Sequence, residues 1–236
     1  MTDYKGIQTL LMSALQLDRP PVAIAFRDEA PAGVDRLAGA QPSGCSFWRL
    51  AADGRTFYTM PEDHLNCPIG SYTHNIPMPQ SREPELMQTL SLMSDVGYIR
   101  MEEVPGIPRL AKTPGVVIYS PLAHAPVDPD VVLVAGRPGR MIVLQEAATR
   151  AQQPASPMLG RPTCMAIPAA LAGTPVVSSL GCVGNRVYTM LGDDQYYVVI
   201  SARALEPLTA ELGTIVAANA TLAEYHATRR ASIAGV

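Results

Sequence analysis

Four cysteines are the residues of this chain best suited to chemistry: Cys45, Cys67, Cys164 and Cys182. Successive members are 22, 97 and 18 residues apart, so they form no Cys-x-x-Cys pair of the kind found in zinc ribbons, thioredoxins or ferredoxins. Any site that they share must be assembled by tertiary structure. Each is expected at a chain reversal or at the end of an element, where proteins commonly place ligands and reactive thiols.

The leading hypothesis is a metal or iron–sulfur site. Its sharper version uses Cys45, Cys67 and Cys182, because a 4Fe–4S cluster held by three cysteines leaves one iron open to a substrate. Cys164, between Thr163 and Met165, is the one best explained as a core residue. Buried free cysteine often behaves simply as a small hydrophobe, and that remains the alternative for all four.

His64 precedes Cys67 by three residues, a spacing at which a turn can bring an imidazole and a thiol together. The pair could ligate one ion, or His64 could activate Cys67 as the nucleophile of a thiol enzyme. The sequence offers no third group to orient the imidazole. His74 and His124 are interpreted as loop histidines without partners.

The segment Gly181-Cys-Val-Gly-Asn-Arg186 supports a different class of function. Its backbone N–H groups could form a nest for an anion, with the Arg186 guanidinium clamping a carboxylate or phosphate. The protein would then be a non-catalytic module that binds a small anionic ligand. The plainer interpretation is a glycine turn before a strand.

The pattern of apolar residues predicts an α/β (α+β) fold, with a mixed sheet and packing helices in one domain that covers residues 1–236. Helices are expected over residues 3–17, 83–96, 139–150 and 163–171, and from about Pro207 to the end. Buried strands are expected over residues 22–26, 115–120 and 131–135, with another extended piece from Val176. The apolar face of the last helix could pack internally or against a second copy, so a homo-oligomer is possible.

Two regions are predicted to form hairpins. Residues 42–79 carry two cysteines, the single tryptophan and several glycines, and they are interpreted as loops and hairpins with a turn at Asp53-Gly54. A second hairpin is expected over residues 186–200, with its turn at Gly192-Asp-Asp. Trp48 and most tyrosines would then be strand residues.

Composition excludes some partners. The formal net charge is −3 and lysine is sparse, so the chain lacks the basic field that nucleic acid binding requires. Its apolar runs are far shorter than the roughly 20 residues of a membrane-spanning helix, and the first residues do not resemble a signal peptide. We therefore expect a cytoplasmic protein, with a small-molecule ligand or a redox partner.

Several motifs resemble the prokaryotic domain-of-unknown-function family 169. They are Gly44-Cys45, His64-x-x-Cys67-x-x-Gly70, Gly160-Arg-Pro-Thr-Cys164, and Ser179-Leu-Gly-Cys182-Val-Gly-Asn-Arg186, followed by Gly192-Asp-Asp. The resemblance spans nearly the whole chain, and the Gly-Cys-x-Gly-x-Arg segment is its most specific part. It implies a coherent site at these positions and supplies no activity.

Overall fold

The computed structural model describes residues 2–156 and 160–234 of the chain. One six-stranded sheet forms its centre, in the order β2-β3-β1-β4-β6-β5. The strands are β1 Val22–Arg27, β2 Phe57–Thr59, β3 Val116–Pro121, β4 Val131–Gly136, β5 Val176–Ser179 and β6 Tyr196–Ser201. Neighbouring strands are antiparallel, with partners such as Ile24 and Tyr119. Among the described residues, parallel pairing is limited to two isolated bridges, Arg36 with Tyr58 and Ala155 with Val176.

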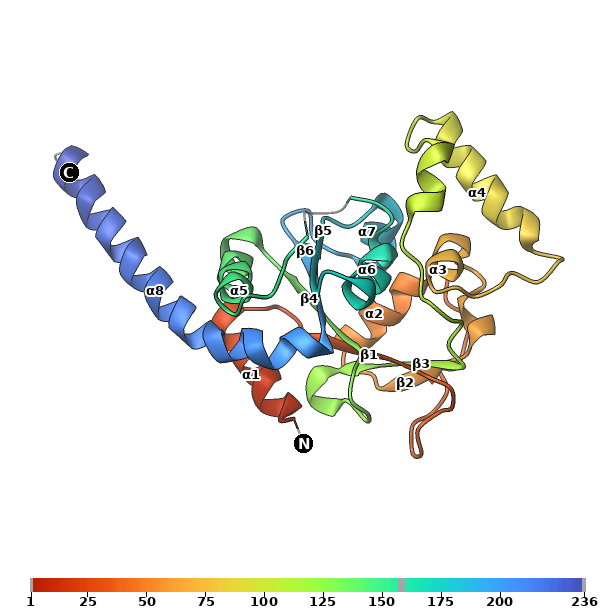
Figure 1. Cartoon of the computed structure of the whole chain (residues 1–236), viewed down its shortest axis with the longest axis horizontal. Helices are drawn as coiled ribbons and strands as arrows, with labels where there is room; N and C mark the ends of the chain where they lie inside the picture. The colour runs from red at the N-terminus through yellow and green to blue at the C-terminus, as the bar shows by residue number, and fades with distance from the viewer. Residues whose placement is uncertain (1, 157–159, 235–236) are drawn as a thin grey trace.

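Helices cover both faces of the sheet (Figure 1). One face carries α1 Tyr4–Leu15, α5 Pro138–Arg150 and the first part of α8 Ala202–Ala234. The other carries α2 Gly44–Ala52, α3 Pro68–Thr73, α6 Ala166–Ala172 and α7 Val183–Thr189. Because both faces are covered, the central strands are continuous apolar runs rather than alternating ones. The expected α/β class, with packing helices around one sheet, is confirmed. The described strands pair in antiparallel fashion, so the sheet is antiparallel where a mixed sheet was predicted.

The remaining elements are short, except α4 Glu83–Asp95, which extends away from the sheet (Figure 1). The 3-10 turns are η1 Pro61–His64, η2 Met101–Gly106, η3 Leu122–His124 and η4 Thr163–Met165. The helices predicted near residues 3–17, 83–96, 139–150 and 163–171, and the strands predicted near 22–26, 115–120, 131–135 and 176, are present.

Both predicted hairpins are wrong at their first arm. Residues Gly44–Ala52 form helix α2, because Ser43 caps its N-terminus by accepting the Cys45 N–H. Gly54, with φ of +100°, follows the end of this helix instead of turning between two strands. Val183–Thr189 likewise forms helix α7, so only the second arm of that hairpin is a strand. Trp48 and Tyr188 are therefore helical residues.

Helix α8 begins earlier than the predicted start at about Pro207. Its first residue is Ala202, and Pro207 lies within the helix. Its buried residues Leu205, Leu208 and Leu212 pack against α5 and the sheet. Ile215 also packs against this core. The later part of the helix projects away from the domain (Figure 1), and Leu222 is 56 % exposed. The apolar face therefore packs internally only along the first part of the helix. None of the described helices has the length and hydropathy needed to cross a membrane.

Candidate functional site: a ring of four cysteines

Each cysteine lies at the beginning of a helical element. Cys45 is the second residue of α2, Cys67 and Cys182 are the N-cap residues of α3 and α7, and Cys164 is the middle residue of η4, which leads into α6. The start of a helix presents backbone N–H groups without intrahelical partners and a partial positive charge. The four thiols thus share one kind of local environment, although they come from distant parts of the sequence.

These four elements pack in a closed ring, which we call the cysteine ring. Helix α2 packs against α7 and against α3, and α3 packs against η4. The circle is closed between η4 and α7, where the Cys182 N–H donates to Thr163 Oγ1 at 2.5 Å. The fold therefore brings together four cysteines that are 22, 97 and 18 residues apart in the sequence.

A second hydrogen-bonded link joins α2 to α3. Ser43 Oγ accepts the backbone N–H of Cys45 at 3.3 Å and donates to Cys67 Sγ at 3.6 Å. Cys67 Sγ also accepts the N–H of Gly70 at 3.3 Å. A Cβ on Gly70 would lie 2.9 Å from that sulfur, so this approach requires glycine. Hydrogen bonds to sulfur are a main means by which proteins tune iron–sulfur clusters.

The thiols are close enough to influence one another's ionisation. Burial raises the pKa of the Cys45 thiol well above its usual range, and negative charge on Cys67 or Cys182 raises it further. Burial likewise raises the pKa of Cys164, with smaller contributions from Cys45, Cys67 and Cys182. Cys45 and Cys164 are therefore protonated in the metal-free protein at neutral pH, and each of these two thiols lies within electrostatic range of the other cysteines.

The side chains do not converge on the position of a single ion. Within residues 2–156 and 160–234, no three His, Cys, Asp or Glu side chains are arranged to hold one metal ion. A multi-iron cluster is larger than one ion, so its cysteine ligands stand farther apart. The donor set of four free thiols suits such a cluster chemically.

Two buried histidines lie beside the ring. His64 is only 2 % exposed, and its Nε2 is 2.8 Å from Thr59 Oγ1. Burial lowers the pKa of His64 to about 3, with a further lowering by His74, so the imidazole is neutral at neutral pH. It therefore cannot form an imidazolium–thiolate pair with Cys67 under these conditions.

His74 differs from the loop histidine that was predicted. It ends α3, it is 4 % exposed, and its ring lies 5.8 Å from that of His64. Its Nδ1 is 3.0 Å from the Gly70 carbonyl, whereas its Nε2 has no hydrogen-bond partner among the described residues. Burial lowers the pKa of His74 to about 4. No local sequence pattern predicts this contact between His64 and His74, because the two rings meet only through tertiary packing.

Asn185 is a polar group of the ring that the sequence did not single out by itself. It is 1 % exposed on α7, and its amide lies close enough to Cys45 to lower the pKa of that thiol. Neither its Oδ1 nor its Nδ2 completes a hydrogen bond of ordinary geometry within the described residues. A buried amide with only such weak contacts, here to the Cys45 thiol and the Tyr197 hydroxyl, is costly, so this one is suited to an additional bound group.

Arg186 holds the backbone around α7 together. Its Nη1 donates to the Gly192 carbonyl at 2.8 Å, and its Nη2 donates to the carbonyls of Gln195, at 3.0 Å, and Leu180. These bonds direct the guanidinium toward the protein. Three of the guanidinium N–H donors are thus engaged by backbone carbonyls, which leaves fewer of them for an anion.

The fold and the ring thus define an α/β protein in which four thiols lie at the starts of helical elements that pack against one another. The model of domain-of-unknown-function family 169, described as uncharacterised ArCR, matches residues 10–211. The chain therefore belongs to this family, as its motifs indicated. Comparison with curated proteins and comparison with solved structures gave no match.

Proposed function

We propose that the protein binds an iron–sulfur cluster through Cys45, Cys67 and Cys182. The observation that carries this proposal is the closed ring in which four separate helical elements each begin with a cysteine and bring the thiols into mutual electrostatic range. Burial as small apolar side chains would not by itself place four cysteines at the starts of helical elements that pack together.

The surroundings of the ring favour cysteines bound to a cationic centre. Metal binding requires thiolates, and the raised pKa of Cys45 makes a thiolate there unfavourable unless a positive centre compensates it. The unpartnered Asn185 amide and the hydrogen bonds to Cys67 Sγ supply polar contacts for such a centre. When bound, the cluster would supply electron transfer or Lewis acidity.

The fourth ligand position has three candidates: Cys164, His64 or an external molecule. Cys164 is favoured over His64, because its ionisation is coupled to all three other thiols. His64 Nε2 is already engaged by Thr59. If Cys164 stays in the core, the open position would accept a small-molecule substrate.

A ligand or redox partner would approach beside Cys67 and Cys182, which are only partly buried. Exposed apolar residues flank Cys182, among them Leu180 and Val183, which are 49 % and 65 % exposed. Four free thiols at one centre are best kept in a reducing compartment, so we place the protein in the cytoplasm.

The test is anaerobic expression with added iron, followed by visible absorption spectra of the wild type and of Cys45→Ala, Cys67→Ala, Cys164→Ala and Cys182→Ala. The proposal expects a cluster spectrum that is lost in the Cys45, Cys67 and Cys182 variants. Loss in Cys164→Ala as well would assign it as the fourth ligand, and retention would leave that position to another group. Circular dichroism confirms that each variant is folded. A spectrum that survives all four substitutions would refute the cysteine ligation.

A further inference from the structure

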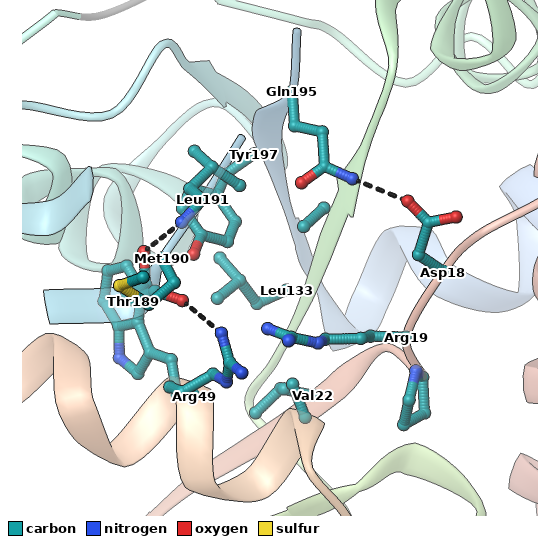
Figure 2. A pocket seen from close by; sticks show the side chains of 14 residues that line it. Asp18, Arg19, Val22, Arg49, Leu133, Thr189, Met190, Leu191, Gln195 and Tyr197 are labelled. Atoms are coloured by element: carbon teal, nitrogen blue, oxygen red, sulfur yellow. Dashed lines mark hydrogen bonds between the residues drawn. The ribbon is translucent and has the colours of Figure 1, made fainter. Parts of the chain in front are cut away.

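A pocket of about 150 Å³ opens at the far end of α2 and α7 from their cysteines. Figure 2 shows it between the end of α2, the residues that follow α7, and strands β4 and β6. Its apolar walls are formed mainly by Trp48, Tyr197, Leu133, Leu191 and Val22. The rings of Trp48 and Tyr197 meet edge to face at 5.6 Å between centroids.

Two arginines direct their guanidinium groups into this pocket (Figure 2). Arg49 donates to Asp53 at 2.6 Å and to the Thr189 carbonyl at 2.9 Å, which fixes its position. Arg19 lies 3.5 Å from the same Asp53 carboxylate and is 40 % exposed. One carboxylate thus serves two guanidinium groups, and one positive charge remains in excess at this wall.

The rim beside Gln195 is acidic. Asp18 accepts from Gln195 Nε2 at 2.9 Å and forms an ion pair at 3.0 Å with Arg137, which also pairs with Asp194 at 2.8 Å. Its charge disfavours a second negative group on a ligand. The wall and rim together therefore suit one negative charge placed at Arg19 and Arg49.

We propose that this pocket binds a small monocarboxylate with an apolar body. Arginine recognises carboxylates through paired N–H donors, and it does so most strongly where water is partly excluded. A pocket of this volume accommodates a ring of benzene size, so the body of the ligand is limited to about six to eight non-hydrogen atoms. Binding at this pocket needs no metal. The pocket proposal and the cluster proposal can therefore each fail without affecting the other.

Ligand binding in the pocket can be followed by tryptophan fluorescence, because Trp48, which lines the pocket, is the only tryptophan of the chain. Full-length protein is titrated with benzoate, with the neutral benzamide and with inorganic phosphate, while Trp48 fluorescence and binding heat are recorded. Benzoate is expected to give a saturable change, and benzamide and phosphate are expected to bind at least about tenfold more weakly.

Variants assign the binding to the arginine wall. Arg19→Gln is expected to weaken benzoate binding about tenfold or more, because it removes the less constrained of the two guanidinium groups. Arg140→Gln, an exposed charge on α5 across the sheet, is the matched control and should bind like the wild type. Ala52→Leu adds bulk at the end of α2 and should weaken benzoate binding without changing any charge.

Thermal unfolding monitors the fold of each variant, and Ala52→Leu still tests the site if Arg19→Gln does not fold. Four outcomes would overturn the proposal. They are no saturable response to benzoate, equal affinity for benzoate and benzamide, tighter binding of phosphate, and unchanged benzoate affinity in either pocket variant.

Discussion

The hydroxyl of Ser43 lies between two thiol-bearing helices and donates to Cys67 Sγ while it caps the helix that carries Cys45. This one side chain therefore has a structural and an electronic role. Ser43→Ala is expected to lower the free energy of unfolding by about 1 kcal/mol through the lost cap, as measured by urea denaturation. In the iron-loaded protein it should also lower the reduction potential, because one hydrogen bond to a sulfur is lost.

Ser43→Thr keeps the hydroxyl and is the control for both measurements. If Ser43→Ala matched the wild type in both free energy of unfolding and reduction potential, the Ser43 hydroxyl would have neither the structural nor the electronic role.

The thiols should differ in reactivity in the metal-free protein. Cys67 and Cys182 are partly exposed, whereas burial keeps Cys45 and Cys164 protonated and inaccessible. Brief treatment with iodoacetamide at pH 8, followed by peptide mass spectrometry, should find Cys67 and Cys182 modified before the other two. Denatured protein, in which all four should react alike, provides the reference. Earlier modification of Cys45 or Cys164 would contradict the burial described.

The buried histidines predict a loss of stability in mild acid. Burial lowers the pKa of His64 to about 3 and of His74 to about 4, compared with 6.5 in the unfolded chain. The unfolded state therefore binds more protons below pH 6.5, and stability falls as the pH falls toward the folded pKa values. Between pH 7 and pH 5 each histidine should cost about 2 kcal/mol, as measured by urea unfolding of metal-free protein.

His226→Gln alters a fully exposed residue and should leave this pH dependence unchanged. His74→Gln should remove about half of it, because one buried imidazole is lost. A free energy of unfolding that is constant from pH 7 to pH 5 would mean that these side chains are not buried as neutral groups.

The Asn185 amide should stabilise the iron-loaded protein and destabilise the metal-free protein. Asn185→Leu removes a buried amide without partners, so the metal-free protein should keep its stability or gain about 1 kcal/mol. The same variant should lose iron to a chelator faster than the wild type. Thr209→Val, a change at another nearly buried polar residue far from the ring, controls for general packing effects. Slower iron loss in Asn185→Leu would contradict the assigned role.

The projecting part of α8 should contribute little to the domain. Deletion of residues 217–236 is expected to change the free energy of unfolding by less than about 0.5 kcal/mol, because the described side chains that it removes are exposed and Ile215, which packs against the core, is kept. A larger loss that depends on protein concentration would instead mean that this helix packs against a second copy.

The sequence predicted the sheet well, since runs such as Val131–Gly136 are covered on both faces and remain apolar throughout. The strand propensities of Phe47, Trp48, Val187 and Tyr188 favour strands in place of α2 and α7. The Ser43 cap overrides this propensity in α2, and packing of the two helices against each other overrides it in both. Serine is a common N-cap residue, so Ser43 could have indicated the start of α2. The type and position of the four cysteines indicate a site, but their meeting depends on contacts between elements whose cysteines are up to 137 residues apart, Cys45 and Cys182, and no local pattern encodes such contacts.

The central claim is most directly tested by the iron and acid-labile sulfide content of wild-type protein purified and kept without oxygen. The account predicts stoichiometric iron with a matching amount of sulfide in the folded chain. Iron without sulfide, or a stably folded protein with neither after reconstitution, would contradict the proposed cluster.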